Sequence, residues 1–344
     1  MEKILNVRFP AEWTKQSAVM LTWPHIHTDW KDNLDEVTDC FAAIAKEIVK
    51  HEKLLIVCKN VDEVKKTLTG IDYTPIIFRE VKTNDTWARD HGPITVFVNG
   101  VPYILDFTFN GWGLKFPANY DNQITRQLYE SHVFSPEAVY QNMQYVVLEG
   151  GSIESDGEGT LLTTKRCLLS ANRNDYKSMA EIADFFQMIF GVERVLCLEH
   201  GYLVGDDTDS HIDTLARFCN KDTIAYVQCT DKNDEHFEEL SQMEKEIQKF
   251  RTAEGKPYRL IPLPMATPVY HEGERLPATY ANFLIINETV LLPFYDSPLD
   301  IPAQKALQEA FPDREIIGIN CLPLIKQHGS LHCVSMQLPE TYLK

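Results

Sequence analysis

Residues 156–198, DGEGTLLTTKRCLLSANRNDYKSMAEIADFFQMIFGVERVLCL, contain most of one structural module. Residues 156–159 predict a tight turn between two short strands, because glycine and aspartate adopt the backbone conformations that such turns need. The second strand of that pair, a helix that ends at Gly191 and a third strand are predicted at residues 161–164, about 176–190 and 195–198. The module therefore follows the order strand, strand, helix, strand.

The same order of elements recurs elsewhere in the chain. Two further helices are predicted over about residues 235–250 and 302–311, and each follows a turn-linked strand pair and precedes a short buried strand. A fainter copy begins with a strand at residues 94–98 and the turn Asn99-Gly100. These patterns predict repeated modules of one architecture.

The first helix is the exception, because no strand pair precedes it. It follows Asp32, and its apolar stripe consists of Leu34, Val37, Phe41, Ile44, Ile48 and Val49. A C-terminal strand around residues 332–337 would supply the missing partner by pairing with residues 18–23. Counting this wrapped unit predicts five modules in a closed α/β ring, and a single domain over residues 1–344 instead of two independent ones.

Bulk properties exclude several classes of function. The 344 residues carry a formal net charge of −17, which argues against nucleic acid as a partner. No apolar run is long enough to span a membrane, and residues 1–8 are too polar for a signal peptide. The eight cysteines form no C-x-x-C pair, which argues against a structural zinc site. Without a secretion signal, we expect reduced thiols in a cytoplasmic protein. The sequence leaves open a homo-oligomer.

Four clusters of chemically reactive side chains lie beside glycine or proline, where strands end and loops begin. They are residues 84–93, 148–151, 206–213 and 328–333. Cys333 follows Gly329 and Ser330, so we expect it to enter a strand from a loop and to act as a nucleophile. The alternative is another buried free cysteine. Neighbouring strand residues point to opposite faces, so His332 is expected to face away from Cys333.

The base for such a nucleophile would come from another segment. If residues 210–213 are extended, His211 and Asp213 share one face. Asp90 and Asp213 near a thiol suit a planar cation, because each carboxylate can accept paired N–H bonds from a guanidinium group. Two nearby anions also raise the pKa of the thiol, and an arriving cation would cancel that effect.

At these clusters the chain resembles the agmatine deiminase family, which is related to bacterial peptidylarginine deiminases. The stretches that carry the resemblance are residues 85–93, 109–113, 148–152, 211–213, 280–285 and 332–333. The resemblance implies the pentein fold, a five-bladed pseudo-symmetric α/β propeller of ββαβ modules closed by pairing of the N- and C-terminal strands. That implication agrees with the five modules predicted from the repeats.

The resemblance also implies a mechanism and a site. Cys333 would attack the guanidinium carbon, and His211 would protonate the departing ammonia and then activate water against an amidino-cysteine intermediate. Asp90 and Asp213 would hold the guanidinium. The remaining expected substrate-binding residues are Trp87 as a pocket wall, Glu149 as a residue that orients His211 or the substrate, and Asp207. Neither a metal nor an organic cofactor is implied.

The substrate prediction rests on charge. Free arginine would need a basic partner for its α-carboxylate, and Arg89 is expected to point away from the pocket, as a strand neighbour of Asp90. Agmatine, converted to N-carbamoylputrescine and ammonia, is therefore the first hypothesis, with peptidylarginine or another alkylguanidine second and amidino transfer third. Residues 327–331 differ from the Gly-Gly-Gly-Asn segment that usually precedes the cysteine in the family. This difference changes the edge of the pocket and leaves the identity of the substrate undecided.

Two further alternatives belong to other classes. A metal-dependent hydrolase would use His211, Asp213, His332 and Cys333, but tight ligand spacing is missing. The pentein fold also serves as a ribosome anti-association factor without catalysis, and fold alone does not exclude such a binding module. The complete set of Cys333, His211, Asp90 and Asp213 favours an enzyme.

Overall fold

The computed structural model describes residues 6–343, whose strands form five sheets of three or four strands and one separate hairpin. The sheet strands are β1 (Val7–Arg8), β2 (Gln16–Thr22), β3 (Lys53–Cys58), β4 (Ile76–Glu80), β5 (Ile94–Val98), β6 (Val101–Thr108), β7 (Val139–Val147), β8 (Ile153–Ser155), β9 (Thr160–Thr164), β10 (Arg194–Leu198), β11 (Ala216–Asn220), β12 (Thr223–Gln228), β13 (Arg259–Pro264), β16 (Leu284–Ile286), β17 (Thr289–Phe294), β18 (Glu315–Asn320) and β19 (Ser335–Pro339). The hairpin consists of β14 (Val269–His271) and β15 (Glu274–Leu276). The longer helices are α1 (Leu34–Ile48), α2 (Val61–Thr67), α5 (Ile124–Glu130), α7 (Met179–Phe190), α8 (Phe237–Ile247) and α9 (Asp300–Ala310).

Four sheets combine an antiparallel strand pair with a third strand that is reached through a helix and pairs in parallel. In the module quoted above, β8 pairs antiparallel with β9, and β9 pairs parallel with β10, which follows α7. The same arrangement holds for β5 to β7, for β11 to β13 and for β16 to β18. The predicted order of strand, strand, helix, strand is confirmed in these sheets.

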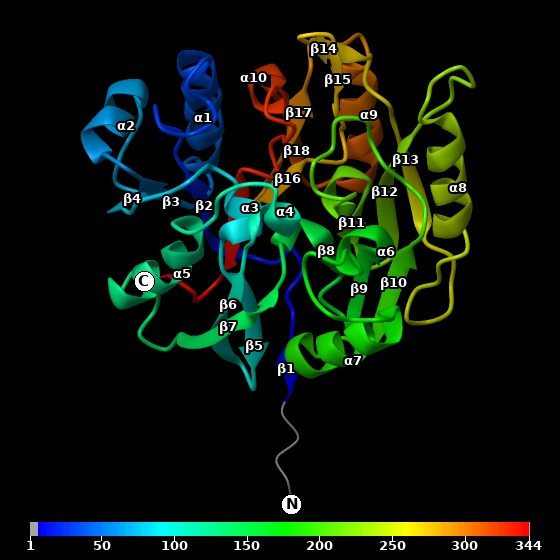
Figure 1. Ribbon diagram of the computed structural model, residues 1–344, viewed down its shortest axis with the longest axis horizontal. Coiled ribbons are helices and arrows are strands. Elements are labelled where there is room, and N and C mark those ends of the chain that lie inside the picture. Colours follow the sequence, from blue (N-terminus) through cyan, green and yellow to red (C-terminus); the bar gives the residue numbers. More distant parts are fainter. Residues whose placement is uncertain (1–5, 344) are drawn as a thin grey trace, which may run out of the picture.

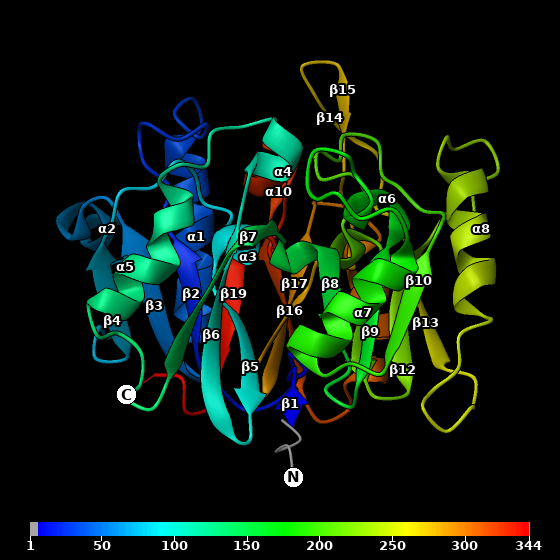
Figure 2. The ribbon, with the colours of Figure 1, turned by 60° about the horizontal axis from the view of Figure 1, so that its bottom comes forward.

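The fifth sheet joins the two ends of the chain. The C-terminal strand β19 pairs antiparallel with β2, and β2 pairs parallel with β3 beyond α1 (Figure 2). This pairing supplies the partner that the first helix lacks in the local sequence. The sheet is extended by β4, parallel to β3, after the short helix α2. Neither α2 nor β4 is predicted from the sequence pattern.

Local sequence explains where the quoted helix begins and ends. The Ser178 side chain accepts a hydrogen bond from the backbone N–H of Glu181, so α7 starts at Met179, three residues after the predicted start. Gly191 ends it in the left-handed conformation, with φ of 67°. On its inner face, Ile182, Phe186 and Phe190 are buried. Capping and apolar spacing thus act together on this module.

The helices flank the sheets, with α1 and α8 on opposite sides of the molecule and the β14–β15 hairpin projecting at one end (Figures 1 and 2). Three short segments from different parts of the chain pack together centrally, namely α3 (Ala88–His91), η2 (Gly150–Ser152) and η3 (Ile212–Thr214). Within residues 6–343, no helix is long and apolar enough to cross a membrane. Of the N-terminal stretch judged too polar for a signal peptide, residues 1–5 lie outside the described part.

Candidate active site

A cavity of about 150 Å³ opens beside these short segments. Four residues predicted from the sequence line it, namely Trp87, Asp90, Asp207 and Cys333. Its remaining walls are formed by Asp29, Asp85, Trp112, Phe116, Asp206, Thr208, Thr214, Gln327, His328 and Gly329. The cavity thus combines one thiol, aromatic walls and several carboxylates.

Cys333 lies in a turn, two residues before β19 begins at Ser335, so the prediction that it enters a strand is wrong. The side-chain oxygen of Asn282 fixes this turn. It accepts hydrogen bonds from the backbone N–H groups of His332, at 2.9 Å, and Cys333, at 3.3 Å. The Cys333 thiol lies 3.4 Å from the same oxygen. Cys333 is 6% exposed, and its backbone carbonyl accepts a hydrogen bond from the N–H of Arg89.

Asp90, in the helix α3, is held by two donors. Trp112 Nε1 donates to its Oδ2 at 3.0 Å, and the backbone N–H of Gly151 donates to its Oδ1 at 3.0 Å. Because α3 is helical, the strand alternation expected for Arg89 does not apply here. Arg89 nevertheless points away from the cavity, toward the side-chain oxygen of Gln337 at 2.6 Å.

His211 and Asp213 share the site for a different reason from the predicted one. Residues 210–213 are not extended, because the 3-10 helix η3 begins at Ile212. The two side chains instead meet Asp90 around Gly151. A Cβ atom placed on Gly151 would lie 2.6 Å from His211 Nδ1, 2.9 Å from Asp90 Oδ1 and 3.2 Å from Asp213 Oδ2. The imidazole and both carboxylates therefore converge on one point.

This convergence makes Gly151 a sensitive position. Gly151→Ala is expected to lower kcat/KM about 10- to 100-fold, because the added methyl group displaces His211 and Asp90 by a fraction of an ångström to an ångström. The measurement is steady-state turnover of the guanidinium substrate that the sequence predicts, with the melting temperature as a check on folding. Unchanged turnover in a folded Gly151→Ala variant would show that these three groups do not act together.

His332 contacts Asp213 and is not among the residues that line the cavity. Its Nδ1 is 2.7 Å from Asp213 Oδ2, and its Nε2 is 2.7 Å from Glu12 Oε2. Glu12 also accepts from Arg217 at 2.8 Å, and all four side chains are buried. Burial opposes ionisation of Asp213, but the hydrogen bond and charge of His332 outweigh it and lower the pKa of Asp213. Glu12, Arg217 and the role of His332 are not predicted from the sequence.

The buried surroundings disfavour charge on Asp90, His211 and Cys333. Burial, reinforced by Asp213 and Glu149, raises the pKa of Asp90 well above its usual range. Burial lowers the pKa of His211 to about 3, so its imidazole is neutral near pH 7. Burial and then the charges of Asp213 and Asp90 raise the pKa of the Cys333 thiol, as predicted from the sequence.

A raised thiol pKa gives a direct expectation for the substrate-free protein. Alkylation of Cys333 by iodoacetamide should still accelerate about tenfold for each pH unit between pH 7 and 9, because only the thiolate reacts and its fraction grows with pH below the pKa. Mass spectrometry of the Cys333 peptide measures the rate. A plateau reached below pH 8 would contradict the raised pKa.

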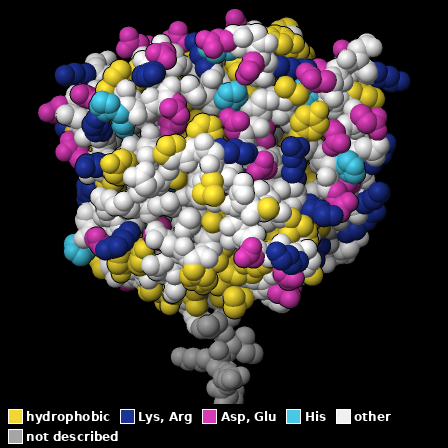
Figure 3. Space-filling model, viewed as in Figure 1, with side chains coloured by type: hydrophobic (Ala, Val, Ile, Leu, Met, Phe, Trp, Pro, Cys, Tyr) yellow, Lys and Arg dark blue, Asp and Glu magenta, His cyan; other side chains and the backbone are white. Residues whose placement is uncertain are grey.

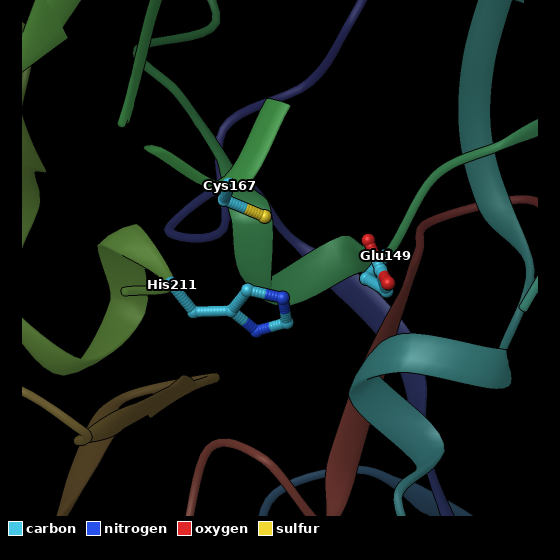
Figure 4. Close-up of side chains that lie close together, drawn as sticks. All are labelled: Glu149, Cys167 and His211. Atoms are coloured by element: carbon cyan, nitrogen blue, oxygen red, sulfur yellow. The ribbon is translucent and has the colours of Figure 1, made fainter. Parts of the chain in front are cut away.

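Glu149 lies outside the lining of the cavity, next to His211. Both of its carboxylate oxygens accept from Arg173 Nε at 3.0 Å, and both residues are buried. Donor atoms of Glu149, Cys167 and His211 lie within 4.8 Å of one another, and this is a group that could hold a metal ion (Figure 4). A search for close cysteine spacing in the sequence does not find it, because the three residues come from separate segments.

Hydrogen bonds and close packing hold the aromatic and acidic residues that line the cavity. Trp87 donates to Asp85 Oδ2 at 2.9 Å, and Gly329 packs so closely on the indole that a Cβ there would lie 2.0 Å from Trp87 Cζ3. The backbone carbonyl of Asp207 accepts from Lys115 Nζ at 2.6 Å. Figure 3 shows further acidic side chains around α10 (Leu322–Ile325) and the β14–β15 hairpin. The surroundings therefore favour a cationic ligand.

Known proteins resemble the chain over nearly its whole length. The family of Porphyromonas-type peptidyl-arginine deiminases matches residues 8–339. An agmatine deiminase of Pseudomonas aeruginosa is 31% identical, over 96% of this chain and 95% of its own.

Solved structures agree with the sequence matches. A Porphyromonas gingivalis protein, provisionally named arginine deiminase, has a TM-score of 0.95 and 52% identity over 98% of this chain and 100% of its own. A cysteine-to-serine variant of the agmatine deiminase of C. jejuni, solved with substrate bound, has a TM-score of 0.92 and 36% identity over 100% and 99%. This likeness identifies the pentein α/β fold. The chain belongs to the family of Porphyromonas-type peptidyl-arginine deiminases.

Proposed function

We propose that this protein hydrolyses agmatine to N-carbamoylputrescine and ammonia. The observation that carries the proposal is the composition of the cavity. Cys333 and Asp90 line it, Asp213 and His211 adjoin it, and none of its lining residues in the described chain is lysine or arginine. A guanidinium group fits the paired carboxylates, and the second cationic end of agmatine fits the acidic wall.

The proposed chemistry begins when the guanidinium cation binds between Asp90 and Asp213. Its charge offsets the two carboxylates that suppress ionisation of Cys333, so the thiol proton can pass to His211. The thiolate then forms a bond to the guanidinium carbon. The C–N bond to one terminal nitrogen breaks, and His211 donates its proton so that ammonia leaves.

The second half of the reaction regenerates the enzyme. His211, neutral again, removes a proton from a water molecule that attacks the amidino carbon. The C–S bond breaks and the sulfur regains a proton through His211. The hydroxyl group added from water loses its proton to solvent as the carbonyl forms, and the ureido product is released. Trp87 forms a wall of the substrate pocket, and Asp207 contributes to its acidic side. Glu149, whose carboxylate Arg173 holds in place, lies within 4.8 Å of the His211 ring and limits where that ring can turn.

A second candidate is deimination of arginine in a peptide, which the description of the matching family favours. Both reactions use the same four groups and differ in what surrounds the guanidinium. A peptide needs room for main chain on both sides, whereas the cavity measures about 150 Å³. This size favours a small free substrate.

Ammonia release from agmatine, free arginine and a blocked arginine peptide tests the proposal. We expect kcat/KM for agmatine to exceed that for free arginine by at least about a hundredfold, equivalent to roughly 2.7 kcal/mol of transition-state discrimination. The reason is that the α-carboxylate of arginine would be buried without a basic partner. Turnover of the peptide with none of agmatine would overturn the substrate while leaving the deiminase chemistry intact.

The architecture and setting of this activity belong to the same proposal. We propose that the five sheets are blades of one pseudo-symmetric propeller, closed by the pairing of β19 with β2, and that residues 1–344 form a single domain. We also propose a cytoplasmic location, which the eight free cysteines support. In such a ring, segments from all modules face a shared centre, which accounts for a site built from α3, η2, η3 and the turn at Cys333.

A further inference from the structure

A group of potential metal ligands lies behind the imidazole of His211. Glu149 precedes η2, Cys167 lies in α6 (Lys165–Leu168) and His211 precedes η3, so three separate segments supply them. The sulfur of Cys167 and the ring of His211 both point toward Glu149 (Figure 4). Their donor atoms lie within 4.8 Å of one another, and all three residues are buried.

One donor in this group lacks a partner among the described residues. His211 Nε2 is buried without a hydrogen bond. The other ring nitrogen, Nδ1, lies 3.7 Å from Asp90 Oδ1, on the side of the two carboxylates proposed to hold the guanidinium. Nε2 is therefore the nitrogen available to a ligand on the side of the ring that faces Glu149 and Cys167. A buried polar atom without a partner is costly, and a bound cation would satisfy it.

The local charge also favours a cation. Arg173 binds Glu149 through Nε and Asp209 through Nη1 at 2.6 Å, so two carboxylates face one guanidinium. Lys115 Nζ also lies 3.0 Å from Asp209 Oδ1, and the charge of Asp213 acts on His211. With a neutral thiol and a neutral imidazole, these three carboxylates and two cations carry one net negative charge. A divalent cation that displaces the thiol proton of Cys167 would bring the total to zero, which lowers the cost of placing the cation in a buried site.

We propose that Glu149, Cys167 and His211 form an inhibitory site for a divalent cation of the zinc class. Thiolate, imidazole and carboxylate are a donor set that zinc accepts, whereas magnesium and calcium prefer oxygen ligands alone. Because the three ligand atoms lie within 4.8 Å of one another, one central point lies within about 2.8 Å of each of them. Movements of the three side chains by less than about 1 Å would then bring each ligand atom to about 2.0 to 2.3 Å from a zinc ion at that point.

The consequence for catalysis follows from where the cation binds. A metal on Nε2 immobilises His211 and withdraws its electrons, while Cys333, Asp90 and Asp213 remain free to hold the guanidinium. Inhibition should therefore lower kcat and leave KM nearly unchanged. This consequence rests on the acid–base role proposed for His211. A metal bound at Cys333 would instead compete with the substrate.

The first experiment titrates zinc chloride into chelator-treated enzyme during agmatine turnover. We expect micromolar zinc to lower kcat at least about tenfold with KM within about twofold, magnesium to have no effect, and EDTA to restore activity. Cys167→Ser should keep kcat within about threefold of wild type and raise the half-inhibitory zinc concentration at least about thirtyfold. Cys219→Ser, which changes another buried cysteine, should retain wild-type sensitivity.

The second experiment does not depend on turnover. Cobalt(II) added to Cys333→Ser should produce the near-ultraviolet absorption of a thiolate–cobalt bond, and the double variant with Cys167→Ser should lose it. The site would be refuted if zinc inhibited wild type and Cys167→Ser equally. It would also be refuted if the single variant Cys333→Ser, which retains Cys167, showed no thiolate–cobalt absorption. Cys167→Ala replaces Cys167→Ser if the serine variant does not fold. Inactivity of wild type toward agmatine would refute the proposed function and leave the cobalt result interpretable.

Discussion

Cys333→Ser is expected to lower kcat for agmatine at least about a thousandfold while preserving the fold. The cavity wall places this sulfur beside Asp90 and near Asp213, where a bound guanidinium carbon would meet it. A serine hydroxyl in the same position stays protonated at neutral pH and forms no thiolate, so the first bond to the guanidinium carbon does not form at a useful rate. Ammonia release under saturating agmatine measures the effect.

The matched control changes a cysteine that lies away from the cavity. Cys58 is buried at the end of β3, and Cys58→Ser should alter the melting temperature while leaving kcat within about threefold. Agmatine should still bind Cys333→Ser, because the carboxylates that hold the guanidinium are untouched. Full activity in Cys333→Ser would refute the nucleophile, whatever the result with Cys58.

His211→Asn is the second change with a large expected effect. It should lower kcat at least about a thousandfold and change KM by less than about threefold, because one imidazole is proposed to serve both proton transfers. Asparagine retains a polar side chain of similar reach but exchanges no proton. The measurement is kcat and KM for agmatine, together with the pH dependence of the residual activity.

The pH dependence separates chemistry from structure. In the wild type, kcat/KM should rise with pH on the acidic side of the pH profile, because groups that must lose a proton titrate there. In His211→Asn, the shape of this acidic side should differ from that of the wild type. A variant that merely loosens the site would lower activity without changing the profile. If His211→Asn changes only KM and leaves kcat intact, the acid–base role is wrong.

Much of the fold could be predicted from the sequence, because its signals are local. Apolar periodicity and turn residues identify the module of residues 156–198 without knowledge of any distant contact. The structure confirms its strand pair, its helix α7 and its parallel strand β10. The pairing of β19 with β2 is predictable for an indirect reason, since the first helix has no other strand to complete its module.

The cavity residues Asp90, Cys333 and Asp207 belong to clusters that the sequence marks by reactive side chains beside glycine or proline, where strands end and loops begin. Trp87 was expected as a pocket wall from the family resemblance, and it lines the cavity too. Tertiary structure alone decided how these groups are held and which others join them. Asn282 lies 51 positions from Cys333, and Trp112 lies 22 from Asp90, yet both bind these residues directly.

The arguments from strand alternation failed for one physical reason, although Arg89 and His332 do lie outside the cavity lining, as expected. Strand alternation was applied to His332 and Cys333, to Arg89 and Asp90, and to residues 210–213, all of which lie outside the strands. In such segments a side chain points where its tertiary contacts hold it. His332 meets Glu12 across the length of the chain, and Cys167 meets His211 through packing between segments. No short-range rule contains those contacts, because only the closed fold brings their partners together.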